Sequence, residues 1–123
     1  MRQIPWSRVM ERANGDGEFR IAARFWRTTL RFDLGSESVR FTVDDGVIRT
    51  IAPSGPGADC AVSVAGSRES WERLLAAVPL WQDLLGAVLR ADFVVTAADP
   101  EAFYAYYPAV RRLVDLVREE SRS

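Results

Sequence analysis

The sequence predicts an α+β fold in which helices cover one face of a five-stranded, mostly antiparallel sheet. Two patterns support this prediction. Apolar residues recur every three or four positions near both ends of the chain, as in amphipathic helices. Elsewhere, apolar and polar residues alternate over short segments, as in strands that bury one face. The 123 residues match the usual size of one domain, so we expect residues 1–123 to form a single domain with its own core.

Two short helices are predicted near the N-terminus. Residues 5–13 carry apolar side chains along one face and stop at Asn14 and Gly15, a pair that breaks helices. Asp16 suits the N-cap of a second helical segment. The apolar side of that segment would consist of Phe19, Ala22, Ala23 and Trp26.

Three strands are expected to follow as an antiparallel meander. Residues 30–34, 39–44 and 47–51 each alternate apolar with polar side chains. Asp45 and Gly46 supply the residue types that a tight hairpin turn needs at positive φ. The second and third strands should therefore form a hairpin.

Two further strands complete the predicted sheet. Residues 59–65 follow a loop rich in proline and glycine, and we expect Cys60 to be a small buried residue at the start of this strand. Residues 90–96 alternate in the same way. Asp33 and Asp92 would then project from the solvent face of the sheet.

Three more helices account for the rest of the chain, giving the order α(α)ββββααβα. Ser67 is a candidate N-cap, Pro79 suits a first helical turn, and Asp99 with Pro100 should start the last helix. Pro108 should kink or divide that last helix. The apolar stripes would be Trp71, Leu74, Leu75 and Val78; Trp81, Leu84, Leu85 and Val88; and Phe103, Tyr106, Tyr107, Val110, Leu113, Val114 and Val117.

The composition excludes several kinds of chemistry. All 16 basic residues are arginine, because the chain has neither histidine nor lysine. Without histidine there is no Ser-His-Asp or Cys-His relay, and the usual zinc ligand is missing. Without lysine there is no Schiff base and no phosphate-binding Walker lysine. We therefore predict no metal and no cofactor, and catalysis would have to use Asp, Glu, Tyr, Arg, Ser, Cys60 or positioning alone.

Other features suggest the location of the protein. A single cysteine forms no internal disulfide, and residues 1–6 lack the apolar run of a signal peptide. No apolar stretch approaches the roughly 18 residues of a membrane span. We expect a cytoplasmic protein. The use of arginine alone, with many alanines, suggests a bacterial genome rich in GC.

The basic residues are concentrated near the N-terminus, although the formal net charge of the chain is −1. Arg20, Arg24, Arg27 and Arg31 would form one stripe on a continuous helix, where they could meet nucleic-acid or lipid phosphates. A solvated face is the simpler interpretation, because Arg31 falls in a predicted strand and the chain has no basic-aromatic RNA motif. We expect no nucleic-acid partner.

Three segments carry a resemblance to a known family. They are residues 39–48 (VRFTVDDGVI), residues 58–67 (ADCAVSVAGS) and the apolar helix that opens at Trp71. In this order they resemble the sterol-transfer domain of the sterol carrier protein type 2 family, over nearly the whole chain. The glycines that the family usually carries around the last strand are missing here, and only Asp99 of that pattern is retained. The resemblance implies an apolar tunnel between sheet and helices that holds fatty acyl chains, sterols or other lipids.

Aromatic residues are the candidates for lining such a cavity. Thirteen aromatic residues are many for one small core, and large rings that do not interdigitate frame ligand cavities. Core packing is the alternative for each of them. The three tyrosines next to Pro108 cannot all face inward, so at least one hydroxyl should reach solvent or a cavity mouth. The candidate ligand-binding residues are Trp6, Trp26, Phe41, Trp71, Trp81, Phe103, Tyr106 and Tyr107.

The sequence thus favours binding over catalysis: a carrier of an apolar small molecule such as a lipid, a fatty acyl chain or a sterol-like compound. One alternative is a small cofactor-free isomerase or cyclase of a bacterial biosynthetic pathway, which would use the same pocket with help from an Asp or Tyr. Another is an accessory interaction domain that forms a homodimer or binds an enzyme partner.

Overall fold

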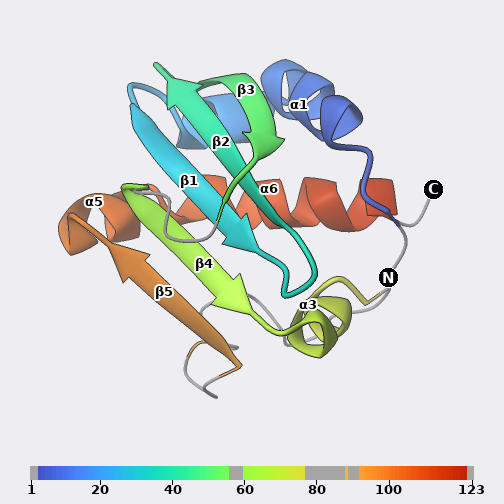
Figure 1. Ribbon diagram of the computed structural model, residues 1–123. Helices are drawn as coiled ribbons and strands as arrows, with labels where there is room; N and C mark the ends of the chain where they lie inside the picture. Colours follow the sequence, from blue (N-terminus) through green and yellow to red (C-terminus); the bar gives the residue numbers. More distant parts are fainter. Residues whose placement is uncertain (1–2, 56–59, 77–87, 89–91, 122–123) are drawn as a thin grey trace.

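In the part of the chain that the structure describes, five strands form one mixed sheet in the order β3-β2-β1-β4-β5 (Figure 1). This computed structural model describes residues 3–55, 60–76, 88 and 92–121. β1 runs parallel to β4, and the other neighbouring strands are antiparallel, which confirms the predicted fold class. The strands are β1 (Thr28–Asp33), β2 (Ser38–Asp44), β3 (Val47–Pro53), β4 (Val62–Gly66) and β5 (Phe93–Ala97).

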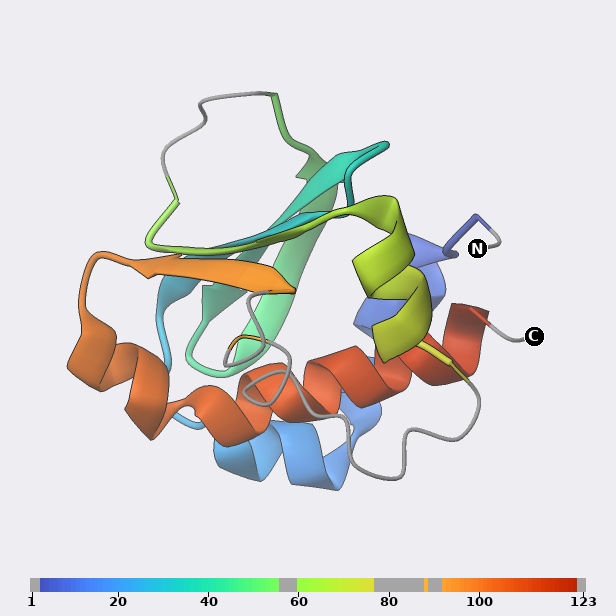
Figure 2. The same cartoon turned by 90° about the horizontal axis from the view of Figure 1, so that it is seen from below.

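Helices cover one face of this sheet, as predicted, and Figure 2 shows them on the same side of the strands. α1 packs against β3, whereas α2 packs against α6. None of the described helices is both long and apolar enough to cross a bilayer. The helices are α1 (Trp6–Gly15), α2 (Gly17–Ala22), α3 (Arg68–Leu74), α5 (Pro100–Ala105) and α6 (Tyr107–Ser121).

α1 extends two residues beyond its predicted end, because Asn14 is used to attach the helix to the sheet. The Asn14 amide nitrogen donates to the carbonyl of Ile48 at 2.9 Å, and the Asn14 carbonyl oxygen accepts from the Ile48 N–H at 2.8 Å. This pair of bonds satisfies backbone groups of an edge strand. It also fixes the position of α1 over β3.

α2 is shorter than the predicted segment, which extended toward Trp26. Its start is as expected, since the Asp16 carboxylate accepts from the Phe19 N–H at 2.8 Å. The helix ends at Ala22, and Phe25 adopts a left-handed conformation with φ of 70°. A helix cannot continue through such a residue. Trp26 is nevertheless buried, as its place in the apolar pattern suggested.

The hairpin between β2 and β3 turns where predicted. Asp45 and Gly46 both have positive φ, at 52° and 75°. A Cβ atom on Gly46 would lie 2.8 Å from the carbonyl oxygen of Ala23, so the turn is packed closely against the segment after α2. Glycine is required at this position both for its backbone conformation and for its lack of a side chain.

The limits of β4 and β5 differ from the prediction. β4 starts at Val62 rather than at residue 59, and Cys60 precedes it as a partly exposed residue rather than a buried strand residue. The Ala61 N–H donates to the Thr29 hydroxyl at 2.9 Å, so this segment is held by a side chain before the strand ladder begins. β5 starts at Phe93, after Asp92, whereas residues 90 and 91 of the predicted strand lie outside the described residues.

The C-terminal helical region is divided at the predicted proline. α5 ends at Ala105, Tyr106 is its C-cap, and α6 starts at Tyr107. Pro108 occupies the first turn of α6, where a missing N–H costs little. The helix predicted to start at Pro79 falls outside the described residues.

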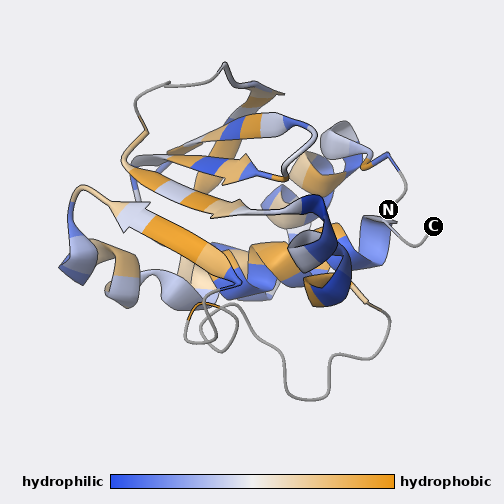
Figure 3. Ribbon diagram, turned by 60° about the horizontal axis from the view of Figure 1, so that its bottom comes forward, coloured by the Kyte–Doolittle hydropathy of each residue, from blue (hydrophilic) through white to orange (hydrophobic). Residues whose placement is uncertain are grey.

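The core lies between the inner face of the sheet and the helices. Figure 3 shows hydrophobic and hydrophilic residues alternating along the strands. The inward rows predicted for the first two strands are buried, and so are the inward residues of α6. The buried strand residues are Leu30, Phe32, Val39, Phe41, Val43, Ile48, Val62, Val64 and Phe93.

The Ser67 cap provides a measurable test of a local prediction. Its hydroxyl accepts from the Ser70 N–H at 3.1 Å and thereby starts α3. Ser67→Ala should lower the free energy of unfolding by about 1 kcal/mol, whereas Ser67→Asp should keep most of the cap. Urea unfolding followed by circular dichroism measures both. Equal stability of the alanine and aspartate variants would contradict the assignment.

Candidate functional site

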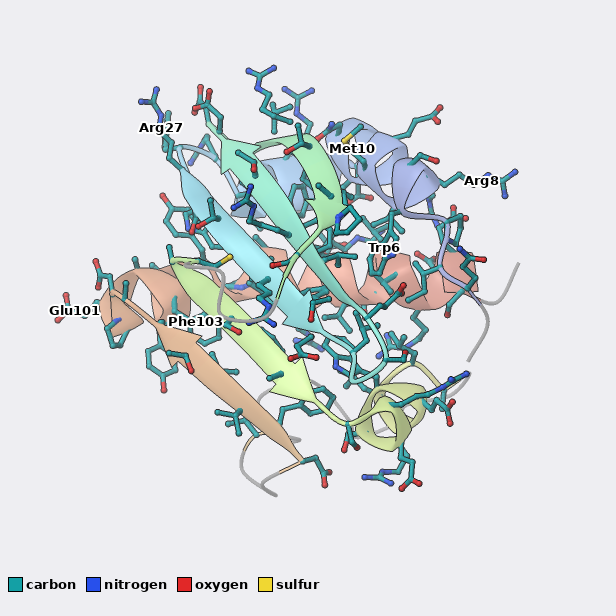
Figure 4. The ribbon with its side chains drawn as sticks, in the orientation of Figure 1. Trp6, Arg8, Met10, Arg27, Glu101 and Phe103 are labelled. Atoms are coloured by element: carbon teal, nitrogen blue, oxygen red, sulfur yellow. The ribbon has the colours of Figure 1, made fainter. Side chains whose placement is uncertain are left out.

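An apolar pocket of about 360 Å³ lies between β5 and α5. Its volume is at the lower end of the range of small-molecule sites, roughly 300–1,000 Å³. Figure 4 shows Phe103 from α5 lying close to the strands at this end of the sheet. The lining residues are Val88, Val95, Thr96, Ala97, Pro100, Phe103 and Tyr104.

The short connection between β5 and α5 forms this pocket. The Ala98 N–H donates to the Ala61 carbonyl at 2.8 Å, which holds the end of β5 beside the segment that leads into β4. Asp99 then caps α5, and its carboxylate accepts from the Ala102 N–H at 3.2 Å. Because α5 starts immediately after the strand, its first turn brings Phe103 next to β5. The predicted cap and the alternation in β5 are therefore the local signals that create the site.

Two hydroxyl groups accompany the apolar lining, those of Thr96 and Tyr104. Tyr104 is 65% exposed, in agreement with the expectation that one of the three tyrosines reaches solvent or a cavity mouth. A tyrosine hydroxyl both donates and accepts hydrogen bonds. The described lining residues include no carboxylate. The site as described can bury apolar groups and offer neutral hydrogen bonds at its edge.

The two aspartates that the sequence places on the solvent face of the sheet, Asp33 and Asp92, lie away from the pocket, and both are partly exposed. Asp33 accepts from the Gly35 N–H at 3.0 Å and lies 3.5 Å from the Arg31 guanidinium. Asp92 lies 3.6 Å from the Arg73 guanidinium. Neither carboxylate lines the apolar pocket, so neither is placed to exchange a proton with a ligand bound there.

Three of the predicted ligand-binding residues belong to a continuous row of rings in the core. Trp6 meets Phe41 edge-on at a centroid distance of 5.7 Å. Through Phe32, this contact continues to Trp71, whose ring is 5.0 Å from that of Phe93. Trp71 also donates its indole N–H to the Asp33 carbonyl at 2.7 Å. The contacts between these aromatic rings connect β2, β1, α3 and β5.

The other predicted residues gather around the junction of α5 and α6. Trp26 and Tyr106 stack almost parallel, with a centroid distance of 5.0 Å and an angle of 9°. Phe103 contacts Tyr104 at 5.6 Å and Tyr107 at 6.1 Å. Of the eight predicted residues, Phe103 lines the pocket between β5 and α5. Trp81 lies outside the described residues.

Sequence reasoning did not select the aliphatic part of the lining. The alternation in β5 puts Val95 on the same face as the buried Phe93, where an aliphatic side chain normally indicates core packing. Ala97 and Pro100 have small side chains that carry no chemical signal. Their role depends on the angle between β5 and α5, so no residue type could have revealed it.

A second hollow, of about 520 Å³, is charged rather than apolar. It lies between α1 and α6 and is lined by Arg8, Glu11, Arg12, Gly15, Asp16 and Glu120. Charges of both signs line it: Arg12 lies 3.5 Å from Glu120, another lining residue, and 3.2 Å from Glu119, which is not part of the lining. We do not assign an apolar ligand to this hollow.

Asp16, at the edge of this hollow, has a structural role. Arg112 from α6 donates two hydrogen bonds to its carboxylate, at 2.9 and 3.0 Å. These bonds hold the pKa of Asp16 below its ordinary value, although partial burial acts in the opposite direction. The same interaction raises the pKa of Arg112. Across the residues that the structure describes, no group of three His, Cys, Asp or Glu side chains could hold a metal ion.

Comparison with solved structures identifies the fold. The crystal structure of sterol carrier protein 2 superposes with a TM-score of 0.78 and covers 96% of this chain and 97% of that one, at 19% sequence identity. The chain has the sterol carrier protein 2 fold. The solution structure of a conserved hypothetical protein from Thermus thermophilus has a TM-score of 0.75 at 18% identity, over 98% of this chain and 90% of that one.

A more distant match with the sterol carrier protein 2 fold is the UbiJ-SCP2 ubiquinone synthesis protein, with a TM-score of 0.57 at 16% identity and 90% of each chain covered. No protein-family model matches the sequence, and no curated protein matches it. The likeness therefore lies in the three-dimensional arrangement. The pocket between β5 and α5 lies between an edge strand of the sheet and a helix.

Proposed function

We propose that this chain binds and carries an apolar small molecule, such as a fatty acyl chain, a sterol-like compound or another lipid. The observation that carries this proposal is the apolar pocket between β5 and α5 in a sterol carrier protein 2 fold. Val95, Ala97 and Phe103 supply its apolar surface. A ligand chain would enter beside Tyr104, whose hydroxyl can bond to a carboxyl or hydroxyl group at the end of the chain.

The expected affinity follows from the burial of methylene groups. Each buried methylene contributes about 0.8 kcal/mol, so roughly ten of them contribute about 8 kcal/mol before costs. Association consumes at least about 4 kcal/mol of this for lost translational and rotational freedom. The balance of about 4 kcal/mol corresponds to a dissociation constant of about 1 mM for ten buried methylenes. Each further methylene that the pocket accepts should tighten binding about fourfold, until the pocket is full.

Carrying is favoured over the isomerase alternative by the chemistry of the lining. The described lining residues include no carboxylate, imidazole or thiol that could act as a general base. A general base with a pKa near neutrality would be needed for efficient proton transfer. The ligand class, the cytoplasmic location and a homodimer or enzyme partner remain predictions.

Filling the pocket tests the proposal. Ala97→Phe places a ring in the cavity and should weaken binding of a fluorescent fatty acid by about tenfold or more, because the ring occupies volume that the ligand needs. Ala65→Phe is the matched control, since Ala65 lies beside Val94 in the β4–β5 register and outside the pocket. Fluorescence titration measures the dissociation constants, and thermal unfolding checks that both variants fold.

Two results would contradict the proposal. One is equal binding by the folded Ala97→Phe and Ala65→Phe variants, which would place the ligand elsewhere. The other is absence of any apolar compound in organic extracts of the purified protein together with no binding of fatty acids or sterols at micromolar to millimolar concentrations. Mass spectrometry of such extracts also identifies the ligand class directly.

A further inference from the structure

Ile21 at the end of α2 and Phe25 in the following loop are unusually exposed for apolar side chains, at 72% and 71%. Phe25 also has φ of 70°, a conformation that aromatic residues seldom adopt. The ring is not needed for the core, because most of it is in solvent. Backbone strain that exposes an apolar ring is a feature of functional surfaces.

Three exposed arginines lie close in sequence to these two apolar side chains. Arg20, Arg24 and Arg27 are all exposed, and the guanidinium carbon of Arg24 lies 5.3 Å from the centre of the Phe25 ring. Within the described residues, Arg20 and Arg24 have no carboxylate partner, whereas Arg27 lies 3.2 Å from Asp44. Figure 4 shows Arg27 directed outward at the start of β1. We call Arg20, Ile21, Arg24, Phe25 and Arg27 the Phe25 patch.

The structure separates this patch from the stripe that four evenly spaced arginines suggested. Arg31 lies in β1 with its side chain only 15% exposed, and it contacts Ser38 and Asp33. Arg31 therefore belongs to the sheet and is not part of the Phe25 patch. α1 is also not part of the patch, since its apolar residues Val9 and Ala13 are buried in the core.

We propose that the Phe25 patch docks on the surface of an anionic lipid bilayer. Ile21 and Phe25 would enter the boundary between headgroups and acyl chains, and the arginines would meet lipid phosphates. Exposed arginines beside exposed apolar side chains are the combination with which interfacial segments bind anionic bilayers, so charge complementarity favours the membrane.

The patch lies next to the end of the molecule that holds the apolar pocket. Trp26 directly follows Phe25 and stacks on Tyr106, the residue between α5 and α6. Docking would therefore bring α5 and α6, which lie beside the pocket, close to the bilayer. The docking proposal does not depend on the pocket having a ligand, and its test measures membrane binding alone.

Vesicle co-sedimentation of the full chain tests the proposal, with phosphatidylcholine vesicles compared with equal parts phosphatidylcholine and phosphatidylglycerol. The wild type should bind the anionic vesicles and release them as salt is raised. Phe25→Gly should weaken binding by about tenfold while keeping or raising the melting temperature, because glycine relieves the positive φ. Arg24→Gln should weaken binding by about fivefold and reduce its salt dependence.

Matched variants distinguish docking through the Phe25 patch from nonspecific adsorption to vesicles. Val94→Ser removes an equally prominent exposed apolar side chain from β5 and should leave vesicle binding unchanged. Asp45→Asn removes a negative charge from the turn beside the patch and should strengthen binding. The proposal is overturned if the wild type binds anionic vesicles no better than neutral ones. That result would be expected if the patch binds an acidic protein instead. Unchanged binding by Phe25→Gly overturns it as well.

Discussion

Replacing Trp71 with alanine should lower the free energy of unfolding by about 3–5 kcal/mol, the largest effect we expect from one substitution. The side chain is completely buried and contacts the rings of Phe32 and Phe93 at 5.2 and 5.0 Å. Its indole N–H also satisfies the Asp33 carbonyl. Proteins of this size have a total stability of about 5–15 kcal/mol, so Trp71→Ala should lose between a fifth and nearly all of it. Urea unfolding followed by circular dichroism measures the change.

Two control variants divide the effect into its parts. Trp71→Phe keeps an aromatic ring but loses the hydrogen bond, and should cost clearly less than the alanine variant, about 1–3 kcal/mol. Tyr104→Ala removes an exposed ring and should change stability by less than about 0.5 kcal/mol. If Trp71→Ala lost less than about 1.5 kcal/mol, the row of rings would not be the centre of the core.

The second largest effect should come from Asp16, whose carboxylate serves two elements. It caps α2 through Phe19 and accepts two hydrogen bonds from Arg112 of α6. Asp16→Ala should lower the free energy of unfolding by about 2–3 kcal/mol, since it removes the cap and leaves a partly buried guanidinium with only an exposed carboxylate, that of Glu18. Asp16→Asn should lose less, because an amide oxygen can still cap the helix. Chemical unfolding at neutral pH measures both variants.

The Asp16 contribution should also depend on pH. In the folded protein Arg112 holds the pKa of Asp16 below its ordinary value, which is about 3.9 in an unfolded chain. The unfolded state therefore takes up the proton first, and the stabilisation is complete above about pH 5 and lost as pH falls through the folded pKa. The stability difference between wild type and Asp16→Asn should be constant around neutrality and shrink below about pH 4. A difference that stays unchanged at low pH would contradict the ion pair.

Local signals predicted the elements well. Asp16, Ser67 and Asp99 each cap a helix as expected, because the cap bond forms with an N–H only three residues away. The turn at Asp45 and Gly46 follows from positive φ, which is likewise a property of adjacent residues. The predictions were less accurate at the ends of elements. α2 ends at Ala22, ahead of the left-handed Phe25, and β4 starts late behind Cys60, because neighbours distant in sequence decide where pairing stops.

The candidate site was less predictable than the fold. Aromatic content suggested a cavity, but it did not distinguish rings that fill the core from rings that border a pocket. Trp6, Phe41 and Trp71 pack into one row. Phe103, of the same residue class, lines the pocket between β5 and α5. The difference arises from the position of α5 relative to β5, which no periodicity encodes.

The sequence by itself determined the class of the protein: an α+β domain with one-sided strands, capped helices, a helix divided at Pro108, and a composition without histidine or lysine. These properties depend on each residue and its near neighbours. Only the tertiary structure decided that β4 lies beside β1 in parallel, that Asp16 meets Arg112, and which side chains surround the pocket. The physical reason is that burial and pairing between distant segments depend on how whole elements pack, and the hydrophobic effect that drives this packing is not directional.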